Sequence, residues 1–179
     1  NDITDGIGAI SSPNYDPFNT TTNSQTDVTV SALFYEGSYD NLTVTIGKND
    51  INGFFDGNAY SNDETAQFMS AMFVRSTGTT FTEVTNYYAP VTSIQYSIGN
   101  IIDLTVAGAA HSYSDLFNNG LGVAEINVKN IIGNGNYRFY GLIDSNNYTR
   151  IVGGAVKNNV GYGVSVDQEI IPDLGVFGR

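Results

Sequence analysis

Six charged residues lie within runs of alternating polar and apolar side chains, where a β-strand would give each of them a fixed direction. They are Asp103, Glu125, Lys129, Arg138, Asp144 and Asp167. Successive side chains of a strand point to opposite faces, so each charge shares a face with polar or small residues. Charges of both signs along one face supply hydrogen-bond donors and acceptors. Such weak, repeated contacts suit neutral polyhydroxylated solutes, and Tyr140, on the face of Arg138, offers a ring for stacking.

Residues for other kinds of chemistry are scarce. The chain has no Cys and a single His, which is His111 in a predicted loop. A lone histidine in a loop is best interpreted as a solvated side chain, and the sequence contains no phosphate-binding loop and no zinc-protease motif. We therefore expect no catalytic residues, no metal and no cofactor.

Four acidic residues lie close together in the sequence, at positions 50, 56, 63 and 64. Their oxygens could bind Ca²⁺, but their spacing is not that of an EF-hand. Two of them could also form a glycosidase pair, although nothing in the sequence fixes their separation. Solvated loop carboxylates are the simpler interpretation. The candidate functional residues of this segment are Asp56, Asp63, Glu64 and Gln67.

The composition narrows the class of protein. Only 14% of the 179 residues are charged, against about 25% in a typical soluble domain, and neutral polar residues fill the gap. A membrane barrel with an apolar outer band and a polar lumen has such a composition, as does a secreted β-sandwich or an adhesin. The net charge of -11 argues against nucleic acid as a partner. The most apolar stretch, 66–74, is far shorter than the ~18 residues of a membrane helix.

Eight runs alternate with a period of two residues, which is the pattern of β-strands. They cover 27–36, 41–48, 91–98, 101–110, 121–129, 136–144, 160–168 and 173–179. Their polar faces carry many small residues, among them Ser97, Thr105, Gly161 and Gly163. A face that looks into a crowded lumen has more need of small side chains than a face that looks onto bulk water.

The connections between these runs alternate in length. Short ones fall near 37–40, 99–100, 131–135 and 169–172, and longer ones at 49–90, 111–120 and 145–159. Outer-membrane barrels have short periplasmic turns and long external loops in this order. Residues 1–26 read as a further loop. In 49–90, apolar residues spaced by three and four from Phe68 to Phe73 predict one or two helical turns, capped by Asn62 or Asp63. We expect this apolar stripe to be buried, and folding back into the barrel mouth is one way to bury it.

Three blocks of the sequence resemble the carbohydrate-selective porins of the bacterial outer membrane (OprB type). The first is Val44–Lys48 with Phe54–Phe68, the second is Asn136–Leu142 with Tyr148–Arg150, and the third is Gly161–Glu169 with Asp173–Arg179. The blocks occur in the family's order and span most of the chain from about residue 28 onward. The resemblance implies a barrel of about 16 strands that lets sugars diffuse across the outer membrane. It also implies that strands are missing at both ends.

The fold expected is therefore all-β: residues 1–179 form one partial domain, about eight strands of a larger antiparallel, up-and-down transmembrane barrel. Asn1 begins no signal peptide, so either the signal has been removed or the N-terminus is missing. The expected function is passive diffusion through a bacterial outer-membrane porin, with membrane lipids and small hydrophilic solutes as partners and homo-oligomers possible. The alternatives are a secreted or surface β-domain such as an adhesin, and a barrel-borne enzyme or receptor.

Overall fold

The structure is a computed structural model that describes residues 32–62, 67, 88–110, 116, 119–145, 148–149, 155–156 and 158–179. Its main element is one eight-stranded sheet in which every pairing is antiparallel. The strands in sheet order are β1 (Leu33–Tyr39), β2 (Leu42–Asp50), β3 (Tyr88–Ile98), β4 (Ile102–Ala110), β5 (Gly120–Lys129), β6 (Gly135–Asp144), β9 (Asn159–Ile171) and β10 (Leu174–Gly178). A separate small hairpin, β7 (Tyr148–Thr149) with β8 (Ala155–Val156), lies between β6 and β9 in the chain.

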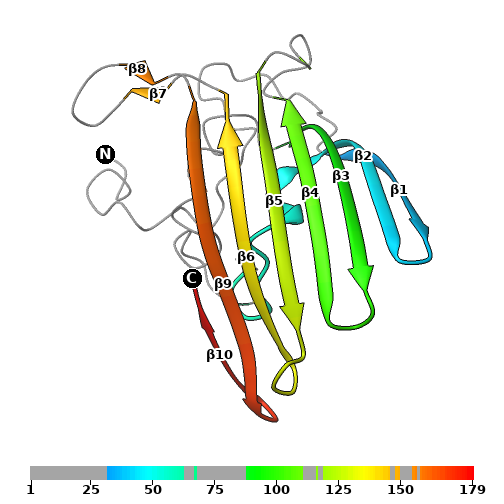
Figure 1. Cartoon of the computed structure of the whole chain (residues 1–179), viewed down its shortest axis with the longest axis vertical. Helices are drawn as coiled ribbons and strands as arrows, with labels where there is room; N and C mark the ends of the chain where they lie inside the picture. The colour runs from blue at the N-terminus through cyan, green and yellow to red at the C-terminus, as the bar shows by residue number, and fades with distance from the viewer. Residues whose placement is uncertain are drawn as a thin grey trace, which may run out of the picture.

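The up-and-down order predicted from the sequence is confirmed. Short turns join the strands at the lower end of the sheet and the longer connections leave from the upper end (Figure 1). Two turns are tighter than predicted: Asp40 and Asp173 adopt left-handed backbone conformations, with φ of 51° and 69°. Asp tolerates this region well and so permits a tight turn directly after each strand. β1 and β9 therefore extend closer to the turn than the sequence pattern indicated. Of the first predicted strand, residues 27–31 lie outside the described part of the chain.

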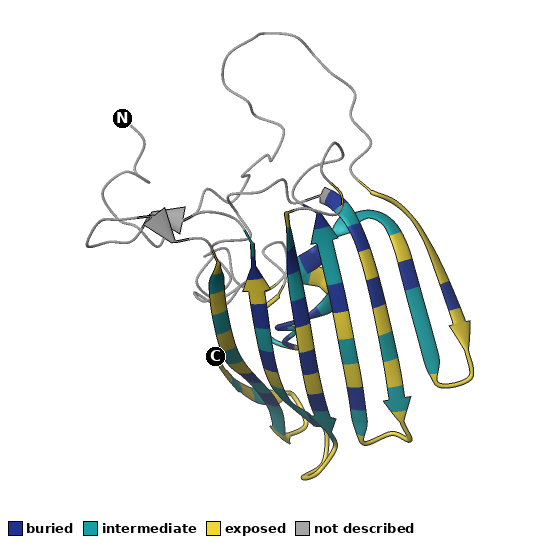
Figure 2. Ribbon diagram, turned by 45° about the horizontal axis from the view of Figure 1, so that its top comes forward, coloured by how far each residue is buried: buried dark blue, intermediate teal, exposed yellow. Residues whose placement is uncertain are grey.

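The two faces of the sheet have the reverse of the polarity found in a soluble protein. Exposed and buried residues alternate along most of the strands (Figure 2). The exposed residues of the outer face are largely apolar, whereas the buried residues of the inner face include the polar and charged ones. One outer row crosses four paired strands through Leu104, Ile126, Phe139 and Val164. The inner row beside it runs through Asp103, Asn127, Arg138 and Ser165.

The apolar outer band is tall enough to match a bilayer. On β9 it runs from Val160 through Tyr162 and Val164 to Val166. At about 3.4 Å per residue, these seven positions span roughly 20 Å along the strand, comparable with the apolar band of about 25 Å on outer-membrane barrels. Tyr162 is 89% exposed, so this face has no covering layer within the described residues.

The upper part of the inner face is covered by the start of the long connection between β2 and β3. Ile51 and Phe55 are buried against Val91, Leu121 and Leu142. A 3-10 helix, η2 (Ile51–Phe54), carries the chain onto this face and contacts β3 and β4. Asp50 caps η2 by accepting a 2.9 Å hydrogen bond from the amide of Asn52. Residues 51–62 thus fold onto the inner face, whereas the apolar stripe from Phe68 to Phe73 lies outside the described residues.

The helical turns expected after Asn62 fall largely on residues outside the described ranges. Among the described residues, Gln67 closes on the preceding segment: its Oε1 accepts from the amide of Asn62 at 2.9 Å and its Nε2 donates to the carbonyl of Ala59 at 2.8 Å. The described helices include none long and apolar enough to cross a membrane.

Small residues on the inner face make room for aromatic rings. Gly163 on β9 pairs with Tyr140 on β6, and a Cβ at Gly163 would overlap the Tyr140 phenol ring. Gly175 on β10 likewise lies under the ring of Tyr60. These contacts explain why glycine occupies positions 163 and 175 of the inner face.

We predict that Gly163→Ala destabilises the protein by about 1–3 kcal/mol, because overpacking a filled site forces neighbours out of their preferred rotamers. The measurement is the free energy of unfolding of the purified protein in urea. Gly141→Ala on the outer face is the matched control, since its nearest neighbour would be a backbone oxygen at 3.9 Å. Equal stabilities of the two variants would contradict the packing role of Gly163.

Candidate functional site

A belt of polar side chains crosses the lower half of the inner face. Lys129 forms an ion pair with Asp103 at 2.7 Å, and Asp103 also accepts a 2.8 Å hydrogen bond from Ser97. Further along, Asn136 donates to Asp167 at 2.7 Å, and Arg138 forms an ion pair with the same carboxylate. The strands set these pairs by register, because Asn136 and Asp167 are direct cross-strand partners and Arg138 lies one row above.

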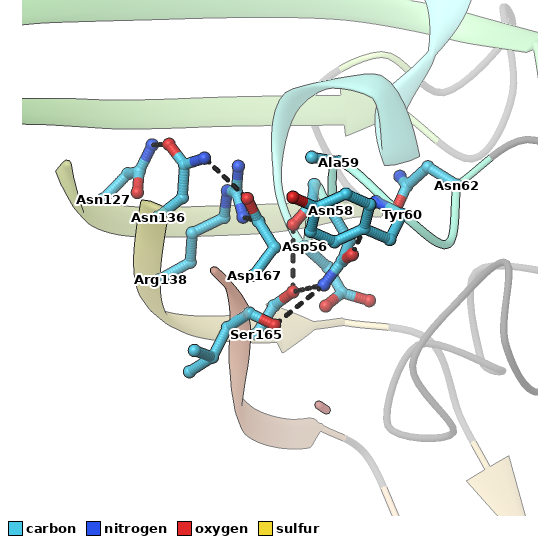
Figure 3. Close-up of polar contacts among 12 residues, drawn as sticks. Asp56, Asn58, Ala59, Tyr60, Asn62, Asn127, Asn136, Arg138, Ser165 and Asp167 are labelled. Carbon is cyan, nitrogen blue, oxygen red and sulfur yellow. Dashed lines mark hydrogen bonds and ion pairs between the residues drawn. The ribbon is translucent and has the colours of Figure 1, made fainter. Parts of the chain in front are cut away.

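Residues 56–62 lie over this wall and are fastened to it by side-chain hydrogen bonds (Figure 3). The amide of Asp56 donates to Glu125 Oε2 at 2.7 Å. Asn58 Nδ2 donates to Ser165 Oγ at 3.2 Å, and Ser165 in turn donates to the carbonyl of Gly57 at 2.9 Å. Glu125 and Ser165 belong to β5 and β9, so the segment bridges two strands that are not adjacent.

Arg179 fastens the other side of this segment. Its Nη2 donates to the carbonyl of Asp56 at 2.9 Å and also contacts Asn62. Its Nε lies 3.5 Å from the Asp56 carboxylate, and both side chains are more than nine-tenths buried. A buried charge is costly unless it is paired, so this pair favours the position of residues 56–62 that is seen.

A small hollow of about 200 Å³ remains between residues 53–57 and the wall. Its lining combines the aromatic rings and backbone of the segment with polar wall residues: Gly53, Phe54, Phe55, Gly57, Gln95, Thr105, Glu125 and Arg138. Two charges of opposite sign, an amide and a hydroxyl therefore face one space beside two phenyl rings. Such a set can exchange hydrogen bonds with a hydroxylated solute and cover its apolar faces.

All seven candidate residues predicted on the strands lie on the inner face. The set is Asp103, Glu125, Lys129, Arg138, Tyr140, Asp144 and Asp167, and all but Lys129 and Arg138 are buried. The structure joins four of them in two ion pairs and brings Glu125 and Arg138 to the hollow. Asp144 is fully buried near the upper end of β6.

Tyr140 lies inside the wall and offers no exposed ring face. It is 4% exposed, because the ring of Phe55 packs edge-on against it at a centroid distance of 5.4 Å and Gly163 lies beneath it. It positions Phe55, and in this arrangement it is not available for stacking on a solute.

The candidates in the long connection have different surroundings. Asp56 contacts Arg179 and the wall, Gln67 binds the backbone of Ala59 and Asn62, and Asp63 and Glu64 lie outside the described residues. Asp50 is used as the cap of η2. Within the described ranges, no cluster of His, Cys, Asp or Glu could hold a metal ion.

Sequence reasoning missed several residues of the site, namely Phe54, Phe55, Asn58, Asn136, Ser165 and Arg179. Asn and Ser are common in this chain, so residue type gave no signal. The strand register does give a signal for Ser165, because Ser165 is the direct cross-strand partner of Arg138. The contacts of Asn58 and Arg179 join segments more than 100 residues apart, and alternation within single strands cannot predict such contacts.

Comparison with known proteins gives a structural match. No protein-family model and no curated protein matches the sequence. The structure is similar to that of Pseudomonas putida OprB, with a TM-score of 0.62 and 14% sequence identity over 79% of this chain. The sheet has the fold of a porin barrel wall. The match covers 40% of the OprB chain, so the present chain spans less than half the length of that porin.

We predict that Ser165→Ala loosens residues 56–60, because it leaves the buried carbonyl of Gly57 and the Asn58 amide group without their shared partner. The opening free energy of this segment should fall by about 1–3 kcal/mol, measured by hydrogen exchange of the amides of residues 57–60. Ser93→Ala is the control, since Ser93 is buried on the same face and makes no hydrogen bond to the described part of this segment. Unchanged exchange in Ser165→Ala would show that the segment is held by other contacts.

Proposed function

We propose that the protein is an outer-membrane porin through which sugars and other small hydrophilic solutes diffuse passively. The observation that carries this proposal is the reversed polarity of the sheet, with apolar side chains exposed outside and charged ones buried inside. In water, such an exposed apolar face would be a large unpaired patch, and monomeric soluble proteins rarely expose more than a few hundred Å² of contiguous apolar surface. In a bilayer, the same face is the solvated one.

The two edge strands of the sheet, β1 and β10, must be paired if the sheet spans a membrane. β1 and β10 each pair with a single neighbour among the described strands, and lipid does not tolerate unpaired backbone groups at sheet edges. We infer that further strands of the full protein pair with these edges and complete a barrel. The porin fold and the 40% coverage of OprB support this inference. Membrane lipids would then be the partners of the outer face.

The inner face of the sheet supplies the lining of the proposed solute path. In this proposal, Glu125, Arg138, Gln95 and Thr105 line the solute path, and residues 51–62 narrow it from the side of the long connections. The lining offers donors and acceptors that can replace the water around a sugar without binding it tightly. An adhesin-like β-domain would have no need for paired charges facing inward, which makes it the weaker alternative.

The membrane orientation of the sheet can be tested with arginine substitutions at two depths. Val106→Arg places a charge in the middle of the outer face, where Val106 is 61% exposed. It should destabilise the full-length protein in vesicles by about 2–4 kcal/mol, whereas Ile131→Arg, in the turn between β5 and β6, should cost about 0–1 kcal/mol. Urea titration of the folded fraction measures both. If Val106→Arg left the free energy of unfolding unchanged, a soluble β-domain would be favoured over a membrane barrel.

Pore activity can be tested by liposome swelling with sugars of graded size. The full-length protein should give swelling rates that fall as the sugar grows, because the path is narrowed by residues 51–62. The chain has no Cys, so Gln95→Cys introduces a single thiol into the hollow, and a charged, water-soluble thiol reagent should slow swelling in that variant. Ile126→Cys, on the outer face, is the control and should be unaffected. A correctly folded protein that gives no swelling at all would refute the porin proposal.

A further inference from the structure

The charges that the described residues place around the hollow do not balance. Glu125 and Arg138 line the hollow, and Asp56, Asp167 and Arg179 lie next to it, which makes three carboxylates and two guanidinium groups. Arg138 is paired with Asp167, and Arg179 with Asp56. Glu125 is the remaining carboxylate, and its hydrogen bond within the described residues comes from a neutral group, the amide of Asp56.

Glu125 is also held where it can act on a solute. It is 9% exposed, and it lines the hollow together with Gln95 and Thr105. Thr105 is its direct cross-strand partner, and this short neutral side chain leaves the carboxylate without a countercharge from β4. When it is ionised, a carboxylate held away from bulk water acts more strongly on a passing ion than an exposed charge does.

The belt of polar side chains on the lower half of the inner face does not offset this surplus of negative charge. Besides Arg138 and Arg179, the described residues of this face include one more cation, Lys129. It is paired with Asp103 at 2.7 Å. Its ammonium group therefore belongs to a neutral pair. Phe54, which also lines the hollow, adds a ring whose face attracts cations and not anions.

From this geometry we infer that Glu125 is a specificity-determining residue, which makes the path past residues 53–57 favour cations and positively charged hydroxylated solutes such as amino sugars over anions. The inference rests on the proposed pore function and extends it. Arg138 lines the same hollow but is paired with Asp167, so Glu125 is the lining charge without an ion-pair partner among the described residues.

The test uses the full-length protein in planar bilayers. Reversal potentials are measured first under a KCl gradient and then with protonated glucosamine (glucosammonium) replacing K⁺ on one side. The wild type should prefer K⁺ over Cl⁻ and should pass glucosammonium. Glu125→Gln keeps an acceptor for the Asp56 amide but removes the charge, and the cation-to-anion permeability ratio should fall by about two-fold or more. Glu169→Gln removes the same charge at the lower end of β9 and should leave the ratio unchanged.

A second variant covers the case in which Glu125→Gln fails to fold. Thr105→Lys places an ammonium group opposite Glu125 and should also abolish the cation preference, whereas Thr105→Gln should keep it. A wild type without cation preference, or equal shifts in Glu125→Gln and Glu169→Gln, would overturn the inference. A folded protein that gives no conductance would refute the porin function itself, which is a different result.

Discussion

The polarity of the two faces is the constraint on which the rest of this structure depends. Because the outer face is apolar in row after row, the charged groups Asp103, Lys129, Arg138 and Asp167 find their partners on the inner face. Cross-strand register brings this about by placing Asp103 near Lys129 and Asp167 near Arg138. The same register leaves Glu125 opposite the neutral Thr105. The wall is therefore a fixed arrangement of charges and not a uniform polar lining.

Residues 51–62 turn this wall into a shaped site. Ile51 and Phe55 bury themselves on the apolar upper part of the inner face, while the backbone that follows is held by Glu125, Ser165 and Arg179. Apolar burial and polar anchoring thus act at successive positions of one segment. Ordering a segment costs about 1–2 kcal/mol per residue in backbone entropy, so both kinds of contact are needed to hold this connection against the inner face.

Much of the fold follows from the sequence, and the limits of this reasoning have physical causes. Alternation of residues such as Ile94, Tyr96 and Ile98 with Ser93, Gln95 and Ser97 predicts strands, because one face must meet a different environment from the other. The inward direction of the charges follows from the cost of placing a charge on an otherwise apolar outer face. The helix η2 has four residues, too few to show a period. Tyr140 could be placed on the correct face, but its burial under Phe55 depends on a segment whose path the alternation does not encode.

Every pairing in the main sheet joins strands that follow one another in the chain, apart from the small β7–β8 hairpin between β6 and β9. A hairpin is therefore a self-contained unit of the wall: inserting or deleting one would shift its neighbours without rerouting any connection. Evolution can change the girth of such a wall by duplicating a stretch of gene that encodes two strands. It can then retain the local pairs, such as Tyr140 with Gly163, that lock each new strand to the next.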